Sequence, residues 1–242
     1  MGVFRNRPSV GLTDNPLDAA PGRHSWYGEQ YVVPIASARQ ALADEGSYFV
    51  AANAVQGTDI TGHAAPALAD NDDTPTKALV HVYNGGPRFI LMDYVKLAVV
   101  VVNASSTATG FVAFVDNAGS SGRTSGGTSL TPASTRGDEP FATGATIFVG
   151  AVVVASTTAN KTGQQVVRPV IAVTLDQYHF WFGHGPMLNS AQALTGTAVA
   201  SVQTSMAPVV IPPNGNFYLC ESNPSGAITA ATYQIELGYA ER

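Results

Sequence analysis

Apolar and polar residues alternate along much of the chain from about residue 47 onward, and this period of two is typical of β-strands. The segments "KALVHVYN" (77–84) and "TGFVAFVDN" (109–117) alternate in this way, so each is expected to bury one face. The longer run "RFILMDYVKLAVVVVNA" (88–104) is rich in β-branched residues, which favour strands. The pattern predicts strands at 31–35, 47–53, 77–84, 88–104, 109–117, 145–156, 165–175, 177–183, 197–203, 207–211, 216–221 and 231–241.

Glycine, proline and asparagine separate these segments. In "VVIPPNGNFYLC" (209–220), the prolines cannot donate to a sheet and Asn-Gly tolerates positive φ, which predicts strand, turn, strand. One segment, "ASARQALADEG" (36–46), predicts a short helix that ends at Gly46. The segments 57–76 and 118–140 are polar or rich in Gly, Ser and Thr, and we expect loops there.

About ten strands without alternating helices predict an all-β protein, and loops of this length favour a jelly-roll-like antiparallel β-sandwich over residues 31–242. Residues 1–30 contain several proline turns and no periodic pattern, which predicts an extended N-terminal arm. A disordered tail is the alternative. The arm residues that we expect to bind a partner are Phe4, Arg5, Arg7, Leu12, Trp26 and Tyr27.

Charged residues make up only 12% of the chain, against roughly 25% in ordinary soluble domains. A net charge of −5 with no basic cluster argues against nucleic acid as a partner. The single cysteine, Cys220, excludes an internal disulfide and predicts a small buried apolar side chain. The most apolar window is about half as long as a membrane span and no signal peptide is evident, so we expect no membrane partner and synthesis in a reducing compartment.

Candidate metal ligands are sparse. His179 and His184 lie five residues apart, which on a strand places them on opposite faces, and His81 could be a distant third ligand. The segment "ADNDDT", with Asp70, Asn71, Asp72 and Asp73, could hold a calcium ion or form a solvated turn. We expect neither metal nor cofactor.

Signatures of catalysis are missing from the sequence as well. No nucleophile elbow, phosphate-binding loop or dinucleotide fingerprint is present. The triplet Arg136-Gly137-Asp138 matches a short integrin-type motif that also occurs by chance. In "QYHFWFG", the aromatic residues Tyr178, Phe180, Trp181 and Phe182 are expected to divide two and two between the faces of a strand. We therefore predict that the chain is not an enzyme.

Several segments, in order, resemble a family of tailed-bacteriophage virion proteins: "DEGSYFVAAN", "GTDITG", "LMDYVKL", "GRTSGGTSLTP", "VGAVVVA", "QYHFWFG", "PVVIPPNGNFYL" and "QIELGYAER". The resemblance runs from about residue 44 to the C-terminus. It implies a jelly-roll-like domain that serves as a capsid cement, decoration or related head-associated protein, without a cofactor or an active site.

Three hypotheses follow. The first is a cement or decoration protein on the virion surface, made in the host cytoplasm, which forms homotrimers and binds the major capsid protein through the arm and one end of the sandwich. The second is a fibre or receptor-binding module that recognises host glycans through Tyr178, Trp181 and nearby loops. The third is an enzyme, either a cupin-like metalloprotein or a glycan hydrolase.

Overall fold

The computed structural model describes residues 23–24, 30–31, 38–53, 59–62, 76–101, 109–138, 142–155, 159–168, 176–183, 201–222 and 231–242. The chain divides into two compact units, Met1–Ala41 and Leu42–Arg242. In the first unit, β1 (Arg23–His24) pairs antiparallel with β2 (Gln30–Tyr31). The helix predicted within 36–46 is confirmed as α1 (Ala38–Asp44). Gly46 follows it with a φ of 74°, and its N–H donates to the Ala43 carbonyl over 2.9 Å.

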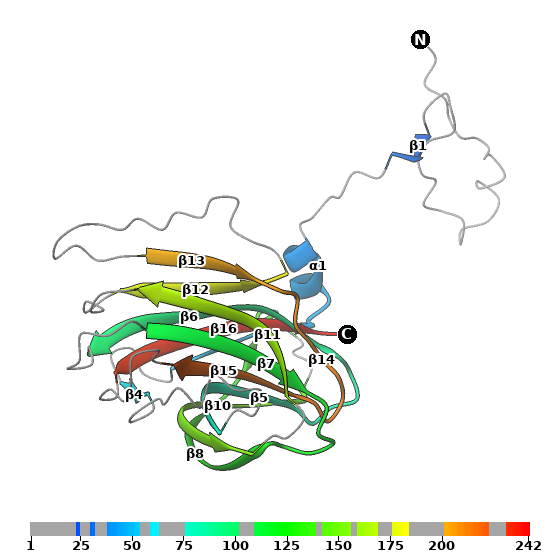
Figure 1. Cartoon of the computed structure of the whole chain (residues 1–242). Coiled ribbons are helices and arrows are strands. Elements are labelled where there is room, and N and C mark those ends of the chain that lie inside the picture. The colour runs from blue at the N-terminus through cyan, green and yellow to red at the C-terminus, as the bar shows by residue number, and fades with distance from the viewer. Residues whose placement is uncertain are drawn as a thin grey trace. The chain divides into compact units, whose positions relative to one another are not determined.

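The second unit consists of two sheets (Figure 1). The six-stranded sheet has the order β11-β7-β15-β5-β10-β8, with β5 (Lys77–Asn84), β7 (Thr109–Asp116), β8 (Arg123–Leu130), β10 (Ala145–Val154), β11 (Asn160–Arg168) and β15 (Asn216–Ser222). The eight-stranded sheet has the order β13-β12-β6-β16-β3-β9, with β14 beside β6 and β4 beside β16. Its strands are β3 (Tyr48–Ala52), β4 (Ile60–Thr61), β6 (Ile90–Val101), β9 (Ala133–Ser134), β12 (Gln177–Phe182), β13 (Ser201–Met206), β14 (Val210–Ile211) and β16 (Thr232–Glu241).

The strand pairing is that of a jelly roll. Four antiparallel pairs are nested along the chain, with the outermost strands paired to each other and the innermost likewise: β3·β16, β5·β15, β6·β12 and β7·β11. A long hairpin that rolls up on itself gives this nesting and divides each arm of the hairpin between the two sheets. The predicted all-β, jelly-roll-like sandwich is therefore confirmed. The pair β12·β13 is parallel and extends one sheet at its edge.

The faces that the two sheets turn toward each other form one apolar core. Phe49, Leu97, Phe111, Phe180 and Tyr239 are examples from different strands, and each is at most 1% exposed. Alternation along β6 and β7 places Leu97 and Phe111 inward, as the sequence pattern predicted. The packing of this core holds the sheets together.

The predicted strand-turn-strand at 209–220 is also confirmed. Asn214 has a φ of 62°, and the Gly215 N–H donates to the Pro212 carbonyl over 2.9 Å, which closes a tight turn. The turn takes the chain from β14 in the eight-stranded sheet to β15 in the six-stranded sheet.

A second apolar cluster lies on the other face of the six-stranded sheet. Ile147 and Val149 of β10 point into the main core, but the register shifts before Val152, and Val152 and Val154 belong to the second cluster. A bulge of this kind reverses which face the following side chains occupy. Cys220 is buried in the same cluster, in agreement with its predicted role as a small apolar side chain.

Three sequence predictions need correction. The segment 118–140 was expected to be a loop, but it contains β8 and β9, and the segment 57–76 contains β4. β8 is the edge strand of its sheet and is mostly exposed, so its sequence "RTSGGTSL" needs no apolar face and gives no alternating signal. The strand predicted at 165–175 begins earlier, at Asn160, and its described part ends at Arg168. β11 is also an edge strand, and its polar first half hides it from a search for apolar runs.

One buried carboxyl group ties the two sheets together across the core. Glu221 of β15 is 3% exposed, and the Tyr233 hydroxyl of β16 donates to its Oε1 over 2.7 Å. Glu221 Oε2 makes no hydrogen bond to any residue in the described part of the chain. Burial raises the pKa of Glu221 from 4.5 to about 7, and the hydrogen bond from Tyr233 only partly opposes this.

Replacing Glu221 by Gln should change how stability depends on pH. The folded protein retains a proton on Glu221 that the unfolded chain releases above its ordinary pKa of 4.5. The contribution of Glu221 to the free energy of unfolding should therefore fall as the pH rises from about 4.5 to about 7. Glu221→Gln should remove this fall, which is on the order of 3 kcal/mol. Urea denaturation at pH 5 and pH 8 measures the difference, with Glu45→Gln on the exposed surface as the control. An unchanged pH dependence in Glu221→Gln would contradict this assignment.

Candidate functional site

The outer face of the eight-stranded sheet carries a group of polar and aromatic side chains, and the polar ones line a hollow. The registers of β12 with β6 and of β16 with β6 align residues from the three strands in rows. The rows are Gln177–Ala98–Gln234, His179–Lys96–Glu236 and Trp181–Tyr94–Gly238. Because neighbouring strands lie about 4.8 Å apart, side chains in one row are in contact range.

A hollow of about 350 Å³ lies above Ala98, and we call it the Ala98 hollow. Ala98 is short, whereas the residues on either side of it in the row are Gln177 and Gln234. His179, Lys96 and Glu236 of the next row also line it, with Ala52, Asn53, Leu97 and Ile235. The hollow therefore exists because one small residue stands among long polar ones.

The second row contains an ion pair that is only partly exposed. Lys96 Nζ lies 2.7 Å from Glu236 Oε1, and the Tyr94 hydroxyl donates to the same oxygen over 2.7 Å. Burial alone would raise the pKa of Glu236, but the hydrogen bonds from Lys96 and Tyr94 outweigh it, so the pKa is lowered. Burial, aided by the charge of Lys96, lowers the pKa of His179. At neutral pH the row thus holds one cation, one anion and an uncharged imidazole.

The aromatic residues of β12 divide three to one, and the predicted division of two and two is wrong. Tyr178, Phe180 and Phe182 are buried in the main core, whereas Trp181 lies on the outer face. Along the strand, Tyr178, Phe180 and Phe182 alternate with His179 and Trp181. His179 therefore takes one of the outward positions, and Trp181 is the one aromatic residue of the four that faces outward. The Trp181 ring lies 5.6 Å from that of Tyr94. Tyr178, predicted to help recognise glycans, is inaccessible.

Gly238 makes room for the aromatic part of this face. A Cβ at residue 238 would lie 2.4 Å from Tyr94 Cε1 and 2.7 Å from the Tyr48 hydroxyl oxygen. With no side chain there, the Tyr94 ring lies over β16, and Tyr48 of β3 reaches across the same strand to donate to Asp93 of β6. Because Gly238 has no side chain, the Tyr94 ring can cover β16. For the same reason Tyr48 can connect β3 to β6, which lie on opposite sides of β16.

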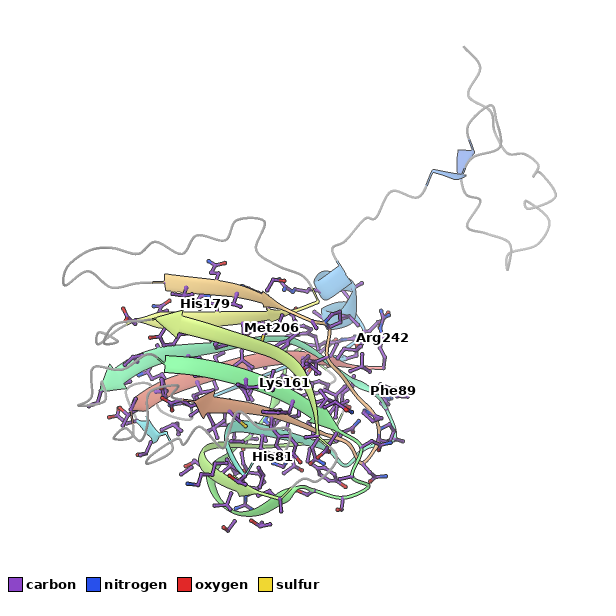
Figure 2. All side chains as sticks on the ribbon, in the orientation of Figure 1. His81, Phe89, Lys161, His179, Met206 and Arg242 are labelled. Carbon is purple, nitrogen blue, oxygen red and sulfur yellow. The ribbon has the colours of Figure 1, made fainter. Side chains whose placement is uncertain are left out.

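The predicted metal ligands are not brought together. His81 is on β5 of the six-stranded sheet and His179 on β12 of the other sheet (Figure 2), and His184 lies outside the described residues. No group of three or more His, Cys, Asp or Glu side chains that could hold a metal ion is present among the described residues. The candidate calcium segment at Asp70–Asp73 also lies outside them.

His81 belongs instead to a buried polar network on the outer side of the six-stranded sheet. Its Nε2 lies 2.9 Å from Asn216 Oδ1, and its ring stacks on Tyr218 with 5.2 Å between centroids. Asn216 Nδ2 and the Tyr218 hydroxyl both donate to the carboxylate of Asp116 over 2.7 Å. Gly122 N–H donates to Asn216 Oδ1, so this oxygen accepts and His81 Nε2 carries the proton.

Burial lowers the pKa of His81 to about 4, although Asn216 and Asp116 favour the charged form. The unfolded chain binds a proton here below its ordinary pKa of 6.5, so this group reduces stability as the pH falls from about 6.5 to about 4. Its sign is opposite to that of Glu221. The imidazole of His81 is therefore uncharged near neutral pH, and the network around it connects strands inside the domain.

Four carboxylates of the described domain accept a hydrogen bond from a tyrosine of another strand. Tyr48 donates to Asp93, Tyr94 to Glu236, Tyr218 to Asp116 and Tyr233 to Glu221, and each pair joins two different strands. No sequence motif marks these pairs, because the partners are distant in the chain. The only signal is that Tyr and Asp or Glu occur on strands that later prove to be close.

The Arg-Gly-Asp triplet forms an internal ion pair. Arg136 Nε and Nη2 donate to the two oxygens of Asp138 over 2.6 and 3.1 Å, and Arg136 Nη1 donates to the Asp44 carbonyl over 2.9 Å. An integrin-type ligand must offer its Arg and Asp side chains to a partner, whereas here they bind each other. The triplet stabilises the turn after β9.

The predicted arm residues Phe4, Arg5, Arg7, Leu12, Trp26 and Tyr27 lie outside the described residues. Their role as a partner-binding segment stays a prediction. A search of the described residues found no helix with the length and apolar character needed to span a membrane.

Gly238→Ala should disturb the outer face without touching the core. The new Cβ would overlap the Tyr94 ring and the Tyr48 hydroxyl, so Tyr94 must move away from Glu236. Overpacking of this kind costs about 1–3 kcal/mol, measurable by urea denaturation. Gly137→Ala is the control, because a Cβ there meets nothing within 4 Å. Equal stability of the two variants would contradict the role of Gly238.

Comparisons with known proteins return no relatives. No protein-family model matches the sequence, no curated protein resembles it and no solved structure matches the fold.

Proposed function

We propose that this chain is a structural protein of a bacteriophage virion, a cement or decoration protein that binds the major capsid protein and stabilises the head. The observation that carries the proposal is that four buried or half-buried carboxylates accept hydrogen bonds from tyrosines of other strands. Groups that would serve an enzyme as acids or bases here connect strands. A protein whose polar side chains stabilise its own fold is suited to a structural role.

The nested pairing of the jelly roll adds to this argument. The C-terminal strand β16 lies hydrogen-bonded between β3 and β6, so one end of the domain is held inside a sheet. A part of a virion must resist unfolding and proteolysis, and a strand fixed on both sides resists local opening. The segments that resemble phage virion proteins include β3, β12, β15 and β16.

The low charge of the chain suits contacts that must persist in varying salt. Exposed ion pairs contribute only about 0–1 kcal/mol and are screened by salt. At one end of the sandwich, Phe89 is 50% exposed and Val210 is 44% exposed, and the β14·β6 ladder brings their strands together. Figure 2 shows Phe89 beside Arg242, to which it is joined by two backbone hydrogen bonds. We propose this end and the arm (residues 1–30) as the contact with the capsid, with homotrimers at three-fold positions.

The proposal is tested by counting the chain in purified virions. A cement or decoration protein is present in hundreds of copies per particle, whereas a fibre or receptor-binding protein is present in a handful. Quantitative mass spectrometry against the major capsid protein gives the ratio. A handful of copies, or absence from virions, would overturn the proposal.

Deleting residues 2–25 should separate folding from capsid binding. The deletion leaves Leu42–Arg242 intact, so the deletion variant should stay folded by circular dichroism and should keep the oligomeric state of the full chain. Binding to capsids assembled from the major capsid protein should be lost. The full chain is the control, and undiminished occupancy by the deletion variant would refute the role of the arm.

A further inference from the structure

The Ala98 hollow has no part in the proposed contact with the capsid. At about 350 Å³ it lies at the lower end of the range for small-molecule sites, roughly 300–1,000 Å³. It lies over β6, a strand whose backbone is hydrogen-bonded to β12 on one side and to β16 on the other. Strand addition by a peptide needs unpaired backbone groups, so the floor of this hollow offers a peptide no such ladder.

Two side-chain amides stand on opposite sides of the hollow with their hydrogen-bonding capacity unused. Gln177 of β12 and Gln234 of β16 flank Ala98, two strand spacings apart, which is about 9.6 Å between their backbones. Neither side chain makes a hydrogen bond within the described part of the chain. Each amide can donate two hydrogen bonds and accept at its oxygen. The separation accommodates a ligand one ring wide that is bonded from both sides.

The next row adds further donors and acceptors without adding net charge. Lys96 and Glu236 neutralise each other, and both hydrogen bonds to this carboxylate end on Oε1, which leaves Oε2 as an acceptor. The imidazole of His179 is uncharged because its pKa is lowered by burial and by Lys96. Lys96, the cation that would bind an acidic ligand, is already paired with Glu236. Glu236, the anion that would bind a basic ligand, is likewise already paired with Lys96. The lining therefore selects for a neutral ligand that both donates and accepts.

We propose that the Ala98 hollow binds a neutral saccharide, held by Gln177 and Gln234 on either side and by Glu236 and His179 at one end. Vicinal hydroxyl groups both donate and accept, which matches amide, carboxylate and uncharged imidazole groups together. Tyr94 and Trp181 of the third row lie beyond His179 and Lys96, where their aromatic surface can border a further sugar unit. This site differs from the one expected from the sequence, since Tyr178 has no part in it. The inference does not depend on the role in the virion.

The test begins with the full chain on an array of neutral and sialylated glycans, followed by titration calorimetry with the strongest neutral ligand. Ala98→Ile fills the hollow, keeps every polar group and raises β-propensity, so it should fold and abolish binding. The double variant Gln177→Ala with Gln234→Ala should bind at least about tenfold more weakly, since hydrogen bonds from both sides are lost. Gln203→Ala is the matched control, because this amide is on the same row as His179 but does not line the hollow.

Binding of neutral glycans that is lost in Ala98→Ile, weakened in the double variant and kept in Gln203→Ala supports the site. Circular dichroism checks that each variant is folded, and if Ala98→Ile is not, the double variant decides. No glycan bound by the full chain, a preference for sialylated glycans, or full binding by the double variant would overturn the proposal.

Discussion

The structure depends on the hydrogen bonding of strands that are far apart in the sequence, above all on β16. This last strand pairs with β3, the first long strand of the domain, on one side and with β6 on the other. Once these ladders form, the other nested pairs have fixed partners, and both sheets acquire their order. Such pairing must overcome the entropy of closing long loops, and burial of the core between the sheets is what compensates for it.

Strand ladders also position the polar groups of the tyrosine–carboxylate pairs and of the Ala98 hollow. Tyr233 can reach Glu221 only because β16 and β15 face each other across the core, and Tyr48 can reach Asp93 only because Gly238 leaves β16 bare between them. The Ala98 hollow arises in the same way, since the register places Gln177 of β12 and Gln234 of β16 on either side of Ala98 of β6. A shift of one residue in either ladder would move these side chains to the opposite face. The fold thus determines the site through register.

The sequence predicted those parts of the fold that have a buried, alternating face. β5 begins and ends at the residues predicted, and the helix and the Asn-Gly turn were found because Gly46 and Asn214 need positive φ. The pattern failed at β8 and β11, because the sequences of these edge strands are rich in Ser, Thr, Gly and Gln and have no apolar period. It also failed at Trp181, where only one of four aromatic residues faces outward. The candidate site was beyond reach from the sequence, because Ala98, Gln177 and Gln234 are unremarkable until the strand register aligns them.

Hydrogen exchange of the native protein tests the central claim, that the pairing of β16 with β3 and β6 holds the whole domain together. If this pairing holds the domain together, amides of β16 should exchange only through global unfolding, with an opening free energy equal to that from urea denaturation. Amides of the edge strand β8 should exchange through smaller openings at lower free energy. Exchange of β16 amides as readily as those of β8 would show that β16 opens without the rest of the domain, and therefore that its pairing does not hold the domain together.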